Sequence, residues 1–270
     1  MQRRRRKKGM GTVKVFIITV LILSGLGGIA IGRNIFFTGD SEERETISGL
    51  GEIDEEQNRE FLEQIQEKRE QIPEELMEAL EKNPEMAEFV AGYPQAEKKE
   101  AKKFSEAERN QTFPLLLQWD KRWGYADYGE SIIALSGCGP TCLSMVVFGL
   151  TRREVTPYET ARYSERAGYY VEGSGTSWGL MTEGAAHYGL SARELSLSEA
   201  AMKAVLNNGG MIICAMRPGD FTTEGHFIVI YGYGEKGFLV HDPNSPARSG
   251  RSWSMEKLSG QIKNLWGYSF

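Results

Sequence analysis

An uncharged run near the N-terminus limits this chain most, because those residues cannot join an ordinary soluble core. Residues 15–32 read VFIITVLILSGLGGIAIG, and six of the seven residues at 2–8 are basic. A helix of this length spans about 27 Å, close to the hydrocarbon thickness of a bilayer. Clustered cations favour the cytoplasmic side. The sequence therefore predicts a basic cytoplasmic tail over 1–14, a single transmembrane signal anchor over 15–32, and an extracytoplasmic remainder.

A cleaved signal peptide is the main alternative to the anchor. A basic segment, an apolar stretch and then small residues form its usual pattern, and Ala30-Ile31-Gly32 resembles a cleavage site. The apolar run is long for a signal peptide, so we favour an uncleaved anchor in the cell membrane. Cleavage would give a secreted protein, and a cytosolic protein is the third reading.

Residues 33–112 form an acidic segment with helical periodicity. Residues 41–110 hold 21 acidic and 10 basic side chains. Apolar residues recur at helical spacing, and Pro73 and Pro84 stand where a proline favours a first helical turn. We expect a helical stalk or linker that separates the next domain from the membrane. An inhibitory or substrate-gating prosegment is the alternative.

Residues 113–270 contain all the Cys, His and Trp residues of the chain, and about 155 residues make a normal domain. Helical patterns come first, including SGCGPTCLSMVVFGL and helices over 157–167, up to Tyr188, and over 199–207. β-rich runs follow at 211–216, 226–233 and 237–242, then a short helix near 255–263 and a strand at 265–268. Helices followed by an antiparallel meander indicate an α+β fold.

Cys138 is the candidate nucleophile. It stands at the predicted start of a helix, where the positive end of the helix dipole favours a thiolate. The flanking Gly137 and Gly139 permit close approach of backbone and substrate, and free amides there could bind an oxyanion. Cys142 and Cys214 lie in apolar surroundings and are interpreted as core residues.

His226 is the candidate base, because it opens a predicted strand after a turn-rich segment. Asp242 ends a neighbouring strand on the same face and can accept a hydrogen bond from the imidazole. His241 points to the opposite face, and His187 lies late in a helix, so both are weaker candidates. Neither Cys nor His has metal-site spacing, so we expect no metal and no cofactor.

Four segments together carry a family resemblance: QWDKRWGY, SGCGPTCLSMVV, GHFIVIYGY and VHDPNS. Residues 113–270 resemble the C39-like peptidases, papain-like cysteine peptidases related to those that process bacteriocins. The resemblance implies a papain-like fold with a nucleophile helix packed on an antiparallel sheet. It assigns the nucleophile to Cys138, the base to His226 and the orienting acid to Asp242.

The chain departs from this family in two respects. Bacteriocin-processing enzymes carry an oxyanion Gln a few residues before the nucleophile, where this chain has Ile132 or its neighbours; the nearest upstream Gln is Gln118. We take Gln118 as the oxyanion candidate, with a simple loop-bridging role as the alternative. The chain also has no GxxxxGK[ST] motif, so the leader-cleaving transporter function is not implied.

The sequence thus predicts a membrane-anchored extracytoplasmic cysteine peptidase that acts on a peptide or protein substrate through a thioester. A cell-wall amidase or transpeptidase with the same Cys-His chemistry is one alternative, and a non-catalytic papain-like binding module is another. The mild net charge of −5 gives no reason to expect a nucleic-acid partner. The sequence gives no indication of the oligomeric state.

Overall fold

The computed structural model describes residues 55–97 and 103–270. The predicted cytoplasmic tail over 1–14, the predicted anchor over 15–32 and the first part of the 33–112 segment lie outside these ranges. Within the two described ranges, no helix is both long enough and apolar enough to cross a membrane.

Residues 55–97 form a series of short helical elements, and prolines lie at the starts of three of them. The elements are α2 (Glu55–Glu67), η1 (Arg69–Gln71), α3 (Glu74–Lys82), η2 (Pro84–Met86), α4 (Ala87–Gly92) and η3 (Tyr93–Gln95). Pro73 stands immediately before α3, as the sequence predicts. The Asn83 side chain caps η2 by accepting a hydrogen bond from the Glu85 amide, one of the first amides of the helix, which have no partner within it.

These helices pack on the later part of the chain through a shared apolar core. Leu76 and Phe89 are fully buried in a cluster that also contains Tyr125, Ile132 and Ala134. The Phe89 and Tyr125 rings stack with their centroids 4.1 Å apart, and the Tyr125 hydroxyl donates a hydrogen bond to the Phe89 carbonyl at 2.7 Å. The role of 33–112 as a stalk stays a prediction, but its described part is docked on residues 113–270.

The second part of the chain begins with helices, mostly short. They are α5 (Glu106–Asn110), α6 (Ile133–Ser136), α7 (Cys138–Thr151), α8 (Pro157–Arg166), η4 (Trp178–Met181) and α9 (Glu183–Ala186). α7 is buried from Gly139 to Phe148, so it forms the central helix of this region. It ends where Arg152 adopts a left-handed conformation with φ of 59°, a common way to terminate a helix.

A six-stranded antiparallel sheet completes the fold, with the order β5-β10-β6-β7-β8-β9. The strands are β5 (Ser191–Glu194), β6 (Met211–Met216), β7 (His226–Gly234), β8 (Gly237–His241), β9 (Ser252–Trp253) and β10 (Ile262–Ser269). Three further helices connect them: α10 (Glu199–Asn207), α11 (Pro246–Ser249) and α12 (Met255–Ser259). Two small hairpins, β1 (Asp127–Tyr128) with β2 (Ser131–Ile132) and β3 (Tyr170–Val171) with β4 (Gly175–Thr176), lie outside this sheet.

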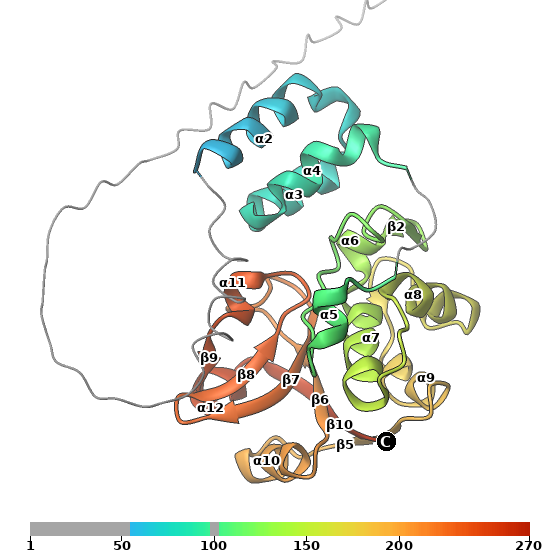
Figure 1. Cartoon of the computed structure of the whole chain (residues 1–270), viewed down its shortest axis with the longest axis vertical. Helices are drawn as coiled ribbons and strands as arrows, with labels where there is room; N and C mark the ends of the chain where they lie inside the picture. Colours follow the sequence, from blue (N-terminus) through green and yellow to red (C-terminus); the bar gives the residue numbers. More distant parts are fainter. Residues whose placement is uncertain (1–54, 98–102) are drawn as a thin grey trace, which may run out of the picture. The chain divides into compact units, whose positions relative to one another are not determined.

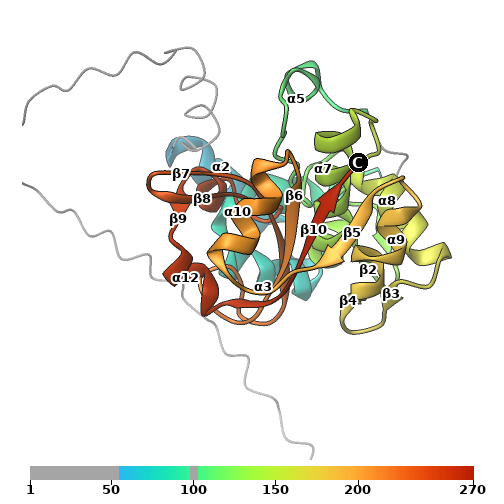
Figure 2. The same cartoon turned by 90° about the horizontal axis from the view of Figure 1, so that it is seen from below.

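The sheet carries a separate apolar core on each face. α7 packs on the face that presents Ile213, Phe227 and Val229, while Met202 of α10 and Leu258 of α12 belong to the cluster of the other face. Figure 1 shows α7 beside β6 and β7, and Figure 2 shows β10 between β6 and β5. The predicted α+β class is confirmed.

Three local expectations differ from the structure. The predicted helix ending at Tyr188 is two short elements, η4 and α9, because Thr182 between them has non-helical φ and ψ of −114° and −88°. The helix near 255–263 ends at Ser259, and β10 begins at Ile262. The last strand also lies between β5 and β6 instead of at the end of a meander, and β5, a largely exposed SARE segment that was not predicted as a strand, forms the edge beside it.

Candidate active site

Cys138 is the first residue of α7 and remains partly exposed. Gly137 precedes it, and no side chain caps this helix end. A side chain at Gly139 would come within 2.8 Å of Thr176, so this glycine allows β4 to pack closely on the start of α7. The thiol therefore stands at an uncapped helix N-terminus, where the helix dipole stabilises a negative charge.

His226 and Asp242 are in direct contact. His226 opens β7, Asp242 follows β8, and the pairing of Val229 with His241 places Asp242 on the same sheet face as His226. His226 Nε2 lies 2.7 Å from Asp242 Oδ1. With Nε2 held by the carboxylate, the other ring nitrogen, Nδ1, is left for a second partner.

Two further groups hold the Asp242 carboxylate. Arg248 Nε donates to Oδ2 at 2.5 Å, and the Asn244 amide donates to Oδ1 at 2.8 Å. Asp242 itself is fully buried. Arg248 was not predicted from the sequence; its only sequence signal is its place just after Ser245-Pro246, a pattern that starts a helix.

The electrostatics of the pair favour an imidazolium beside a carboxylate. Burial opposes the charge on His226, but Asp242, through its charge and hydrogen bond, and the hydrogen bond and charge of Cys138 raise the pKa of His226 to about 10. Burial likewise opposes the charge on Asp242, yet His226 and Arg248 hold the pKa of Asp242 below its ordinary value of 3.8. Asp242 and Cys138 thus both favour the protonated form of His226.

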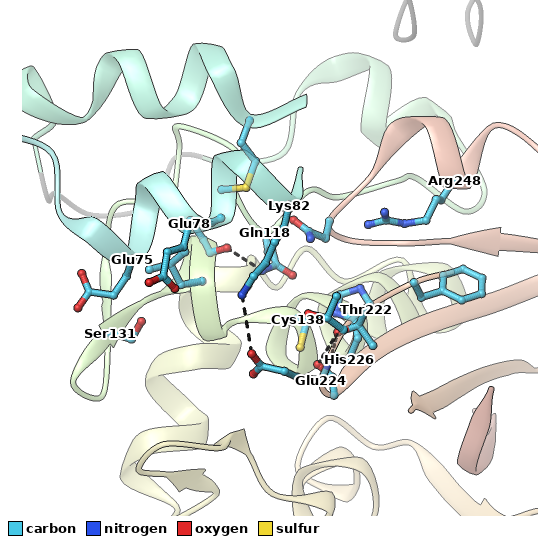
Figure 3. A pocket seen from close by; sticks show the side chains of 18 of the residues that line it. Glu75, Glu78, Lys82, Gln118, Ser131, Cys138, Thr222, Glu224, His226 and Arg248 are labelled. Carbon is cyan, nitrogen blue, oxygen red and sulfur yellow. Dashed lines mark hydrogen bonds and ion pairs between the residues drawn. The ribbon is translucent and has the colours of Figure 1, made fainter. Parts of the chain in front are cut away.

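A cleft opens on both sides of these residues. One cavity of about 520 Å³ is lined by Cys138 and His226 together with Gln118 and α3 residues such as Glu78 and Lys82. A second cavity of about 780 Å³ is lined by Cys138 and His226 together with the β3–β4 hairpin and Trp178, which is 41% exposed. Figure 3 shows the first cavity with Cys138 and His226 at its floor and α3 as one wall.

Gln118 lies in the first cavity, and 4% of its surface is exposed. Its Nε2 donates to the Ala134 carbonyl at 2.7 Å, and its backbone amide donates to the Pro243 carbonyl at 2.7 Å. The side chain therefore bridges to the Ala134 carbonyl, which is the loop-bridging role named above as the alternative. The second N–H of the side-chain amide is not used in this contact. Its Oε1 is buried without a hydrogen-bond partner among the described residues.

The other histidines and cysteines of the chain have different surroundings from those of His226 and Cys138. His241 donates from Nε2 to the Phe113 carbonyl at 2.8 Å, and burial lowers its pKa to about 4, so it is a neutral core histidine. His187 stacks on Tyr163 at 4.1 Å. Cys142 and Cys214 are fully buried, and burial raises the pKa of each thiol well above its ordinary value. Within residues 55–97 and 103–270, no three candidate ligands gather as a metal site.

Comparison with known proteins identifies the family of this chain. A model of the Peptidase_C39 like family matches residues 110–269. Two similar crystal structures are the peptidase domain of Streptococcus ComA, a bifunctional ABC transporter of a quorum sensing pathway (18% identity, TM-score 0.38), and a putative C39-like peptidase from Bacillus anthracis (14% identity, TM-score 0.36). They cover 58% and 63% of this chain, which in turn covers 98% of each. No curated protein matches. Because the family model spans more than half of the sequence and includes Cys138, His226 and Asp242, this chain belongs to the Peptidase_C39 like family.

Proposed function

We propose that this protein is a cysteine peptidase that hydrolyses peptide bonds, with Cys138 as nucleophile, His226 as acid and base, and Asp242 as the group that orients the imidazole. One observation carries the proposal: His226 Nε2 lies 2.7 Å from Asp242 Oδ1, and Cys138 and His226 together line an open cleft. A nucleophile, a base and an orienting group in series are the parts that acyl transfer requires.

Acylation uses the Cys138 thiolate and the His226 imidazolium. The sulfur attacks the carbonyl carbon of the scissile bond, and a tetrahedral intermediate forms. As the C–N bond breaks, His226 donates its proton to the leaving amine, and the substrate carbonyl stays on Cys138 as a thioester. Asp242 keeps the imidazole oriented and stabilises its positive charge before the proton leaves.

Deacylation reverses the role of His226. The neutral imidazole accepts a proton from water, and the resulting hydroxide attacks the thioester carbon. The C–S bond breaks, the carboxylic acid product leaves, and the thiolate–imidazolium pair is restored. The backbone amides at the start of α7 and the free N–H of Gln118 are our candidates for donors to the oxyanion.

The test is hydrolysis of a diverse peptide mixture by the purified full-length chain, read by mass spectrometry, with Cys138→Ala as the decisive variant. Cys138→Ala should abolish cleavage and retain the fold, because the sulfur lies at a cleft and not in the core. Cys142→Ala is the matched control, one helical turn away on the same helix. Cleavage that survives in Cys138→Ala contradicts the proposal.

We also propose that the chain is anchored in the cell membrane by residues 15–32, with the peptidase domain on the extracytoplasmic side. The basic cluster and the apolar run support this topology. After carbonate extraction the full-length chain should stay in the membrane pellet, and a protease added to intact cells should digest the domain. A soluble, shortened product indicates a cleaved signal peptide instead.

A further inference from the structure

The loop over residues 242–248 carries the acid that contacts His226 and the arginine that holds this acid. Asp242 at its start contacts the imidazole, and Arg248 at its end pairs with the same carboxylate. Within this loop the Ser245 hydroxyl accepts a hydrogen bond from the Arg248 amide at 3.1 Å and thereby caps α11. The position of this loop therefore sets the position of the acid that orients His226.

Residues of the N-terminal helices hold this loop from outside. The Glu85 carboxylate accepts hydrogen bonds from the Ser245 hydroxyl and, at 2.9 Å, from the Ala247 amide. Asn83 Nδ2 donates to the Asn244 carbonyl at 2.6 Å. Glu85 lies outside residues 110–269, the part of the chain that matches the family, so these contacts are added to the family domain by the preceding segment.

The Glu85 contacts form one end of a continuous chain of polar groups. The Ser245 hydroxyl donates a hydrogen bond to Glu85, and the same hydroxyl oxygen accepts a hydrogen bond from the Arg248 amide. Arg248 then pairs with Asp242, and Asp242 with His226. A carboxylate suits this place because it accepts from two donors, a hydroxyl and a backbone amide, at the start of a short helix.

We propose that Glu85 is a positioning residue of the active site, which fixes the 242–248 loop so that Asp242 and Arg248 stay in place against His226. The proposal rests on the proposed function. It makes the segment around α3 and η2 a part of the working peptidase and not only a spacer between membrane and domain.

Glu85→Ala should act on the chemical step more than on substrate binding. A loosened loop misplaces Asp242, and small misplacements of catalytic groups cost about 10- to 100-fold in rate. We therefore expect kcat to fall in that range and KM to stay within about twofold. The substrate-free enzyme offers a second measurement, the NMR titration of the His226 ring, whose midpoint should fall from about 10.

Other titratable groups that line the cavity around His226 stay unchanged in this variant. They include Cys138 on α7, Glu224 in the preceding loop, Glu75, Glu78 and Lys82 of α3, and the Asp242–Arg248 pair itself. A lowered midpoint in Glu85→Ala therefore reports on the Asp242 contact, since no charge adjacent to the imidazole is removed.

Three more variants make the test specific. Glu88→Ala removes the 2.8 Å ion pair with Lys121, which also joins the helices to the domain but does not touch the loop, and it should behave as wild type. Glu85→Gln keeps an accepting oxygen and should restore much of kcat. Ser245→Ala breaks the same chain one step later and should lower kcat and the His226 midpoint even if Glu85→Ala does not fold.

Wild-type kcat and His226 titration in folded Glu85→Ala or Ser245→Ala would overturn the proposal. An equal loss in Glu88→Ala would also overturn it, since it would indicate a general effect of docking the helices. Failure of the proposed function is distinguishable, because the His226 titration needs no substrate and no turnover.

Discussion

Replacement of Asp242 by Asn is the perturbation that reaches furthest into this site. Asn has nearly the same shape and can still accept a hydrogen bond from His226, but it removes a fully buried negative charge. That charge stabilises two cations at once, the His226 imidazolium and Arg248. The variant should therefore lose both catalytic rate and conformational stability.

The size of the stability loss follows from the structure. A rise in the pKa of His226 from 6.5 to about 10 corresponds to about 5 kcal/mol of preference for the imidazolium, part of which comes from Cys138. Loss of one partner of a buried ion pair costs about 3–5 kcal/mol. Because Asn keeps one hydrogen bond, we expect about 3 kcal/mol, which a domain of ordinary stability survives.

The loss should depend on pH. His226 has a raised pKa in the folded state, so its contribution is complete below about pH 6.5 and disappears as the pH rises through about 10. Asp242 has a lowered pKa, so its contribution is present above its ordinary value of 3.8 and is lost as the pH falls below it. The stability difference between wild type and Asp242→Asn should be largest between these two ordinary values, 3.8 and 6.5.

Urea unfolding followed by tryptophan fluorescence measures this difference, at about pH 6 and about pH 9.5. The difference in free energy of unfolding should be smaller at the higher pH. Turnover at neutral pH should fall by about 10³- to 10⁴-fold, as when the acid of a comparable triad is replaced by its amide. An equal stability difference at both pH values, or wild-type turnover, would refute the assigned role of Asp242.

Three other changes have defined outcomes. Cys142→Ala should keep the turnover of the enzyme and cost roughly 1 kcal/mol of stability in urea unfolding, since Cys142 is a buried core thiol; a turnover loss equal to that of Cys138→Ala would show that the nucleophile is misassigned. Gln118→Ala should lower kcat about 100-fold without changing the iodoacetamide alkylation rate of Cys138, and wild-type kcat would remove Gln118 from the oxyanion site. Lys82→Ala should lower KM with little change in stability, because the 3.8 Å pair of Lys82 with Glu224 is exposed and crosses the first cavity; an unchanged KM contradicts this role.

Much of the arrangement around the candidate site follows from local patterns. The glycines and proline around Cys138 predict a helix start there, and α7 begins at this residue. Alternation along two adjacent strands predicts that His226 and Asp242 share a face, and they are hydrogen bonded. Such features are predictable because helix termini and strand faces depend on neighbouring residues in the sequence.

The contributions of α3, Glu85 and Arg248 to the site could not be predicted from local sequence patterns. The apolar stripe of α3 predicts an amphipathic helix but does not identify the surface that it covers, which includes Tyr125 and Ile132. Glu85 contacts residues about 160 positions later, and Arg248 reaches Asp242 because the loop turns back at Ser245. Long-range docking and loop paths depend on the assembled fold, so an acidic helical segment with few apolar residues gives the same pattern as a solvated stalk.

Trapping of the acyl-enzyme is the most direct test of the account. An intact peptide that the enzyme is known to cleave is incubated with the full-length chain. The reaction is stopped with acid within a few turnovers, and the modified residue is located by peptide mapping. The account predicts a mass increase equal to the acyl part of the substrate, carried as a hydroxylamine-sensitive thioester on Cys138 and absent from Cys138→Ala. An acyl group on a different residue, or continued hydrolysis by Cys138→Ala, would contradict it.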